Sequence, residues 1–155
     1  MDIMVRKATG ADVAGIATIL RELGWFETII AETEDETQAR VAAIVQAARA
    51  DQYLSVYVAE GDDERVMGYA SVHWLAYGYL AGPEGFISEL YILEADRGHG
   101  VGTLLLESIQ LEARVRGCHR LRLINIARRE SYHREFYKRL GWEERPGDFS
   151  FEFIL

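Results

Sequence analysis

An apolar strand, a glycine-rich turn, an apolar helix and a second strand follow one another between residues 86 and 126. The first strand reads FISELYIL, the helix is predicted from about Gly100 to Arg116, and the second strand reads RLRLINI. Two strands joined through a helix in this way pair in parallel, by a right-handed crossover. Because FISELYIL is almost continuously apolar, we expect both of its faces to be covered.

The residues before this segment predict a strand, two helices and a β-hairpin. A short strand at residues 3–8 precedes Thr9 and Asp12, a pair typical of a helix start, and the helix should end near Gly24. A connector, WFETIIAETEDE, leads to a second helix over about residues 34–49. YLSVYVAE and RVMGYASVHW, joined by a GDDE turn, read as two antiparallel strands.

The residues after the crossover predict one more helix and one more strand. Gly117 lies where a helix-ending glycine is expected. YHREFYKRLGW reads as a helix that ends at Gly141, and FSFEFIL as a last, alternating strand. We therefore predict a single α/β (α+β) domain over residues 1–155, of order βααβββαβαβ, with helices on both faces of a mixed, mostly antiparallel sheet.

The charge of the chain is unevenly distributed. The net charge of −8 argues against nucleic acid as the main partner. Residues 1–96 contain 6 Lys and Arg against 17 Asp and Glu, whereas residues 97–155 contain 11 against 8. The difference indicates an anion site in the second half and a cation-attracting surface in the first, or simply two helix surfaces that differ by chance.

Several classes of protein are disfavoured by the composition. The amino terminus lacks the pattern of a signal peptide, and no apolar run approaches the roughly 20 residues of a membrane helix. A single cysteine, Cys118, excludes an intrachain disulfide, and with four scattered histidines it gives no metal-ligand spacing. We expect a cytoplasmic protein with no membrane partner and no metal, and Cys118 as a core filler.

The glycine turn, Arg97-Gly98-His99-Gly100-Val101-Gly102, predicts an anion site. A dinucleotide loop requires G-x-G-x-x-G, but the last position is Thr103, and a nucleotide triphosphate loop requires a lysine that is missing. Glycines let the backbone approach a ligand closely, and the first amides of the next helix are unpaired. With Arg97 and His99 adding positive charge, a diphosphate is the natural guest; a tight turn without a ligand is the alternative.

Two motifs in the chain resemble the GNAT N-acetyltransferase superfamily. The signature [RQ]-x-x-G-x-[GA] is matched by residues 97–102. The second signature, an aromatic-Tyr pair followed by x-x-x-G-[FW], is matched by Phe136-Tyr137 and Gly141-Trp142. The predicted order of helices and strands is similar as well, so the resemblance covers nearly the whole chain.

This resemblance implies acetyl-CoA as the donor and a strand-like site for its pantetheine arm. The strands on either side of the glycine turn splay apart in this family, and an amide-bearing arm pairs with the exposed backbone. Asn125 is a further candidate, or else an Asn that caps a loop. The implied cofactor-binding residues are Tyr91, Ile92, Leu93, Arg97, Gly98, His99, Gly100, Val101, Gly102, Thr103 and Asn125.

The resemblance and the residues together predict two catalytic groups. Tyr137 matches the family's proton donor to the departing thiolate, although the spacing from His133 to Tyr137 is one residue longer than in a common variant. An extra residue in a helix can be absorbed as a π-bulge. Glu89 is the candidate base, because a carboxylate in an apolar strand is costly unless it is paired or functional, and burial would raise its pKa. The alternatives are a packing role for Tyr137, a salt-bridged Glu89, and His73 as the base.

Aromatic and acidic residues of the connector and of the loop after the hairpin are expected to bind the acceptor. Aromatic faces and carboxylates suit a cationic amine. We expect a small amine, with a protein lysine or amino terminus as the alternative, and a homodimer interface as another use of the aromatics. A non-catalytic acyl-CoA-binding module also stays open. The candidate acceptor residues are Trp25, Phe26, Glu27, Trp74 and Tyr77.

Overall fold

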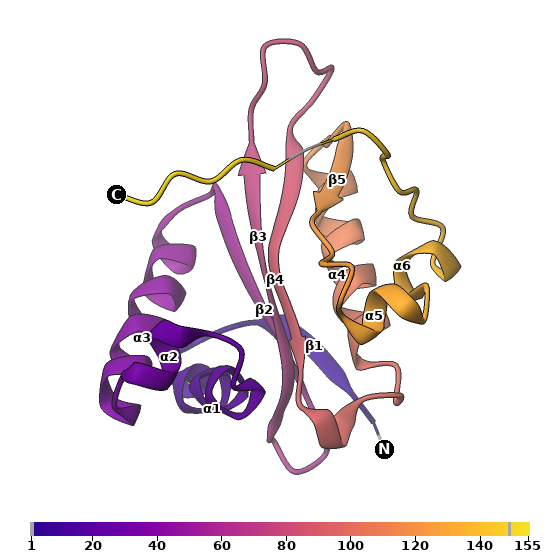
Figure 1. Ribbon diagram of the computed structural model, residues 1–155. Coiled ribbons are helices and arrows are strands. Elements are labelled where there is room, and N and C mark those ends of the chain that lie inside the picture. Colours follow the sequence, from indigo (N-terminus) through magenta and orange to yellow (C-terminus); the bar gives the residue numbers. More distant parts are fainter. Residues whose placement is uncertain (1, 149) are drawn as a thin grey trace. The chain divides into compact units, whose positions relative to one another are not determined.

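The strands within the described residues, 2–148 and 150–155, form one sheet of order β1-β2-β3-β4-β5 in the computed structural model (Figure 1). Neighbours from β1 to β4 pair antiparallel, and β5 pairs parallel with β4. The predicted mixed, mostly antiparallel sheet and the parallel crossover are thus confirmed. The strands are β1 (Met4–Lys7), β2 (Leu54–Glu60), β3 (Val66–Leu75), β4 (Glu84–Ile92) and β5 (Arg120–Leu123).

Helices lie on both sides of this sheet, as Figure 1 shows. On one side are α1 (Val13–Leu23), α2 (Glu27–Ala31) and α3 (Glu34–Ala50); on the other is α4 (Val101–Val115). Short 3-10 turns precede α1 (η1, Gly10–Asp12) and follow β4 (η2, Glu94–Asp96). The connector between α1 and α3 contains α2, which its sequence did not predict.

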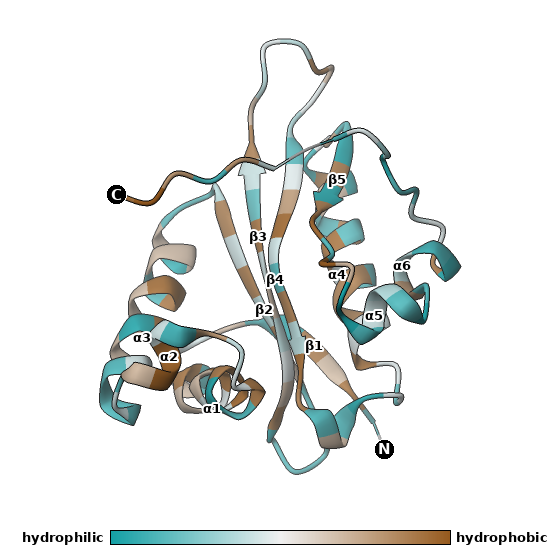
Figure 2. Ribbon diagram, viewed as in Figure 1, coloured by the Kyte–Doolittle hydropathy of each residue, from teal (hydrophilic) through white to brown (hydrophobic). Residues whose placement is uncertain are grey.

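Apolar side chains fill the space between the sheet and each helical layer, and Figure 2 shows the apolar runs of the central strands and of α1. Successive side chains of a strand point to opposite faces, and residues of β2 that point to either face are buried. Each buried aliphatic side chain contributes about 1.5–3 kcal/mol. The α1–α3 side includes Ile16, Ile19, Leu20, Val41, Val45, Val56, Val58 and Tyr69, and α4 buries Val101, Leu105, Leu106, Ile109 and Ala113.

The helix boundaries follow from local capping. Thr9 with Asp12 and Thr33 with Glu36 each form a complete capping box, before α1 and α3 respectively. Gly24 and Gly117 adopt left-handed φ angles of 63° and 68° directly after the helices, a conformation that glycine enters without a steric penalty. The predicted start and end of α1 are therefore confirmed.

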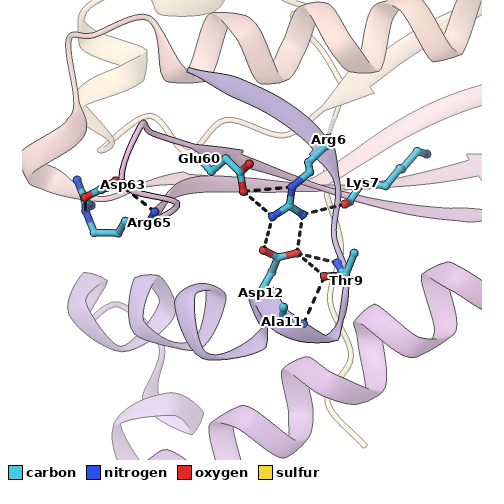
Figure 3. Close-up of polar contacts among 8 residues, drawn as sticks. All are labelled: Arg6, Lys7, Thr9, Ala11, Asp12, Glu60, Asp63 and Arg65. Carbon is cyan, nitrogen blue, oxygen red and sulfur yellow. Dashed lines mark hydrogen bonds and ion pairs between the residues drawn. The ribbon is translucent and has the colours of Figure 1, made fainter. Parts of the chain in front are cut away.

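One guanidinium joins β1, η1 and the end of β2 (Figure 3). Arg6 donates hydrogen bonds to both carboxylate oxygens of Asp12, at 2.8 and 2.9 Å, and to Glu60. Burial alone would raise the pKa of Asp12, but the hydrogen bonds from Arg6 and Thr9 outweigh it and hold that pKa below its usual range.

The chain divides into two compact units, one up to Leu123 and one from Ile124. The second unit contains α5 (Glu130–His133) and α6 (Phe136–Arg139). The single helix predicted for YHREFYKRLGW is wrong, because the backbone turns through Glu135 at a left-handed φ of 52°. The segment between His133 and Tyr137 contains this break between two helices, not a π-bulge. Gly141, with a φ of 84°, ends the second of them as predicted.

Two predicted strand segments do not form. The fifth strand stops at Leu123 rather than at residue 126, and residues 150–155 have no regular structure; Phe149 of the expected last strand lies outside the described residues. An alternating apolar pattern produces a strand only where another strand satisfies its backbone, and no described residue pairs with 150–155. Phe151, Phe153, Ile154 and Leu155 are consequently exposed. Within the described part of the chain, every helix is too short or too polar to span a membrane.

Arg6→Gln should lower the free energy of unfolding by about 2 kcal/mol at neutral pH, because it leaves the buried Asp12 without its cation. This loss of free energy is at the low end of what breaking a buried ion pair costs, since 34% of the Arg6 side chain is exposed to solvent. The folded-state pKa of Asp12 is depressed, so the contribution of the pair is present above the unfolded value of about 3.9 and disappears as the pH falls through the folded value. Urea unfolding at pH 7 and pH 2 measures this, with Arg40→Gln as a surface control; an equal loss at both pH values would contradict it.

Candidate active site

The glycine turn after η2 adopts backbone angles that require glycine. Gly98 and Gly100 have φ angles of 81° and 84°, and a Cβ built on either would meet no heavy atom within 4 Å. Open space therefore lies over the turn. The first N–H group of α4 that donates to the backbone of the turn is that of Leu104, which lies 3.0 Å from the Gly100 oxygen. The amides before it are those a helix start leaves for an anion, so the turn fits a diphosphate.

The start of this turn is held by three contacts. The Leu93 N–H bonds to the Met67 oxygen at 3.0 Å, and the Asp96 N–H bonds to the Leu93 oxygen at 2.9 Å. The buried carboxylate of Asp96 accepts two hydrogen bonds from Arg65, at 2.6 and 2.8 Å. This bidentate pairing with Arg65 keeps the pKa of Asp96 below its usual range.

Beyond Ile87, strand β4 continues without β5 beside it. The last pair between the two strands is Ile87 with Leu123, whereas β4 extends to Ile92. Along an antiparallel strand, the backbone N–H and C=O groups of one residue bond to the partner strand, and those of the next residue point away from it. Because Leu93 bonds to β3, the N–H and C=O groups of Ile92 and of Leu90 point to the edge that β5 has left. The sequence analysis named Tyr91, Ile92 and Leu93 for this edge; of these, the register directs only Ile92 to it, because Leu93 and Tyr91 face β3. Leu90 was missed, since its place follows only from the register.

A β-bulge places Glu89 on the side of the sheet that α1 and α3 cover. The register between β3 and β4 shifts after Ser71, which pairs with Glu89, so that Ser88 is the extra residue. The Ser71 hydroxyl donates to the half-buried Glu89 carboxylate at 2.9 Å. On the same face Tyr69 is 2% exposed, and burial, together with the negative charge of Glu89, raises the pKa of its hydroxyl.

Four aromatic rings meet on this face of the sheet. Trp25, Phe26 and Tyr69 contact Tyr91 edge to face, with ring centroids 6.0, 5.6 and 5.8 Å away. The Arg97 guanidinium lies 6.0 Å from the Trp25 ring. The structure therefore brings Trp25 and Phe26 together with Tyr91 on the open part of β4, and it places Arg97 of the glycine turn beside Trp25.

The connector that carries Trp25 and Phe26 is fixed by the side chain of Arg21 on α1. Its guanidinium donates to the backbone oxygen of Glu32 and to the Thr37 hydroxyl, each at 3.0 Å. The buried Ile29 of α2 packs into the same core. Glu27 begins α2 and is exposed.

Other predicted site residues lie with different partners. The Trp74 indole donates to Ser55 at 3.0 Å, and the Arg116 guanidinium lies 4.7 Å from its ring. The Tyr77 hydroxyl donates to Glu84 at 3.4 Å. His73 contacts Ser88 at 3.1 Å.

The second unit contains Asn125 and Tyr137. The Asn125 side-chain oxygen accepts a hydrogen bond from Ser131 at 3.1 Å. The Tyr137 ring contacts Phe136 at 5.0 Å and Trp142 at 6.0 Å. In the first unit, burial raises the pKa of the Cys118 thiol, which suits an inert side chain.

Comparison with known proteins shows which family the chain resembles. The sequence model of the acetyltransferase (GNAT) domain matches residues 52–144. An L-methionine sulfoximine/L-methionine sulfone acetyltransferase of Pseudomonas paraeruginosa is 32% identical over 92% of this chain and 81% of its own. A thialysine N-epsilon-acetyltransferase of Bos taurus is 23% identical over 92% of this chain and 85% of its own.

The fold is also that of a solved structure. A transcriptional regulator from Bacillus halodurans C-125 superimposes with a TM-score of 0.80 and 22% identity, covering 98% of this chain and all of that one. At this identity the likeness shows the fold alone. The family match over more than half of the chain, together with the 32% identical relative, shows that this protein belongs to the GNAT acetyltransferase family.

Proposed function

We propose that the protein transfers an acetyl group from acetyl-CoA to the amine of a small cationic molecule, in a ternary complex. The observation that carries the proposal is the succession of features along β4 and directly after it. The strand provides the bulge with Glu89 and the open backbone edge at Leu90 and Ile92, and it leads through η2 into the glycine turn.

The donor would lie along this strand. The diphosphate would be held at the turn by Arg97, Gly98, His99, Gly100, Val101, Gly102 and Thr103, mostly through backbone N–H groups. The amides of the pantetheine arm would pair with Leu90 and Ile92 as an added strand does. Tyr91 and Leu93 flank these positions, and Asn125 stays a candidate from the motif. Acetyl-CoA, when bound, supplies the acetyl thioester.

The acceptor amine would lie near Glu89. Aromatic faces at Trp25, Phe26 and Tyr91 favour a cation, and the Glu89 carboxylate adds the matching charge. Glu27 extends the acidic character to α2. The two relatives are named as acetyltransferases of thialysine and of methionine sulfoximine or sulfone, all of which are small molecules that carry an amine. Trp74 and Tyr77 contact other groups and do not form part of this proposal.

The chemistry requires two proton transfers. An alkyl amine with a pKa near ~10 is protonated at neutral pH and has no lone pair to attack with. Glu89, held by Ser71, would take its proton directly or through water. Tyr137 would give a proton to the departing thiolate, and its place in the second motif supports this role.

Incubating the purified protein with acetyl-CoA and a panel of amines should release CoA thiol most rapidly with small diamines and amine-bearing amino acids. Thiol release followed with a chromogenic disulfide measures the rate, and a lysine-containing peptide serves as the protein-like control. Preference for the peptide would refute the small-molecule acceptor. Binding of acetyl-CoA without thiol release from any amine would refute the enzyme reading.

Glu89→Gln should lower kcat by about 10²-fold or more, the typical contribution of a general base. The amide keeps the size of the side chain and a hydrogen bond to Ser71, but it cannot accept a proton. The Kd for CoA, measured by calorimetry, should not change. Glu107→Gln, at an exposed position of α4, is the matched control; a kcat equal to that of wild type would exclude Glu89 as the base.

Tyr137→Phe should reduce kcat by about 10²-fold because the thiolate would leave without a proton donor. The Kd for CoA should stay within twofold of wild type, roughly the limit of such a measurement. Tyr132→Phe removes a hydroxyl from α5 that bonds to Glu144 and serves as the control. Full activity of Tyr137→Phe would show that another group protonates the thiolate.

A further inference from the structure

The guanidinium of Arg65 connects the β2–β3 hairpin to the start of the glycine turn. Its two terminal nitrogens donate to the two oxygens of Asp96, at 2.6 and 2.8 Å. Asp96 ends η2 and immediately precedes Arg97. The hairpin and the turn are separated by about thirty residues of sequence, so this contact is a tertiary one.

Arg65 is itself held in place by the hairpin. Its backbone oxygen accepts from the Gly61 N–H at 3.2 Å, and its N–H donates to the Asp63 carboxylate at 3.2 Å. The Asp63 carboxylate also lies 3.6 Å from the Arg65 side chain (Figure 3). Glu64, between them, has a left-handed φ of 60°. The hairpin therefore presents the guanidinium in a defined orientation.

Besides Asp96, the turn is held at its ends, where the Arg97 N–H bonds to the Glu94 oxygen at 3.3 Å and the Arg97 guanidinium lies beside Trp25. The positions where Gly98 and Gly100 would bear a Cβ face open space, and His99 between them is exposed. No side chain of the turn packs into the core until Val101, which is 2% exposed. The path of the backbone between Asp96 and Val101 is thus determined by its two ends, and Asp96 is the first of them.

The pair also controls the charge beside the anion site. The side chain of Asp96 is only 8% exposed, so without Arg65 an uncompensated carboxylate would remain buried. That negative charge would lie two residues from Gly98, where it would repel a diphosphate. Arg65 neutralises it without itself occupying the turn, whose own basic residues are Arg97 and His99.

We propose that Arg65, through Asp96, is a positioning residue for the diphosphate-binding turn. The proposal rests on the proposed donor site and adds a residue that the sequence analysis did not single out. Arg65 touches neither donor nor acceptor. It acts by fixing the backbone amides of residues 98–103 and by cancelling the charge of Asp96.

Arg65→Gln should raise the Kd for CoA about tenfold or more in calorimetry, a readout independent of turnover. It should lower kcat/KM for acetyl-CoA by the same factor but leave kcat/KM for acetyl-pantetheine, which lacks the diphosphate, unchanged. Arg65→Lys, which keeps the charge but loses the fork of two donors, should fall between Arg65→Gln and wild type. Hydrogen exchange of the amides at 98–103 should become faster in Arg65→Gln.

Arg6→Gln is the matched control, because it also removes a guanidinium bonded to both oxygens of a buried Asp. It should leave the Kd for CoA unchanged. Equal losses with acetyl-CoA and acetyl-pantetheine, or an unchanged Kd for CoA in Arg65→Gln, would overturn the positioning role. If Arg65→Gln fails to fold, Arg65→Lys decides by the same comparison. A wild-type protein that does not bind CoA would instead refute the donor site.

Discussion

The separation of β5 from β4 after Ile87 and Leu123 is the constraint on which the arrangement of the first unit depends. Backbone N–H and C=O groups in a folded protein are nearly always paired, so an edge left open inside a sheet is costly unless another molecule completes it. The bulge at Ser88 lies just past the last pair with β5. The Glu89 carboxylate and the open edge are thus successive parts of one strand, with their spacing set by the rise of an extended chain, and the glycine turn follows after η2.

The helices on the two sides of β4 support different segments. On one side α4 packs on the sheet through Val101, Leu105 and Ile109, and its amino terminus faces the turn. On the other, α1 and α3 hold the connector with its aromatic residues. The guanidiniums of Arg6, Arg21 and Arg65 each connect segments distant in sequence through hydrogen bonds to buried acceptors. Such pairs are weak sources of net stability, but they are effective at fixing geometry.

The sequence predicted the features that depend on local patterns. Capping boxes, left-handed glycines and the strand-turn-helix crossover each depend on a few adjacent residues, and the predicted ones were confirmed at Thr9, Gly24 and Gly117. The roles of Leu90, Ser71 and Arg65 depend on register and on tertiary pairing, which no local pattern records. Two predictions failed for a related reason: that of one helix through Glu135, and that of a strand over the described residues 150–155. Periodicity shows which structure a segment prefers, but not whether a partner is present to stabilise it.

Arg21 ties the connector to α1 and α3 by bonding to a backbone oxygen and to a threonine hydroxyl, and not to the aromatic residues themselves. The path of this segment is consequently held in part by contacts that do not involve the side chains at positions 25 and 26, although Phe26 also packs against the core. Replacements at these two positions would change the shape and polarity of the surface beside Tyr91 and leave the Arg21 contacts in place. Under the proposed function, a lineage could in this way exchange one acceptor for another by few substitutions, since recognition through main-chain groups is inherited with the fold and recognition through side chains can change.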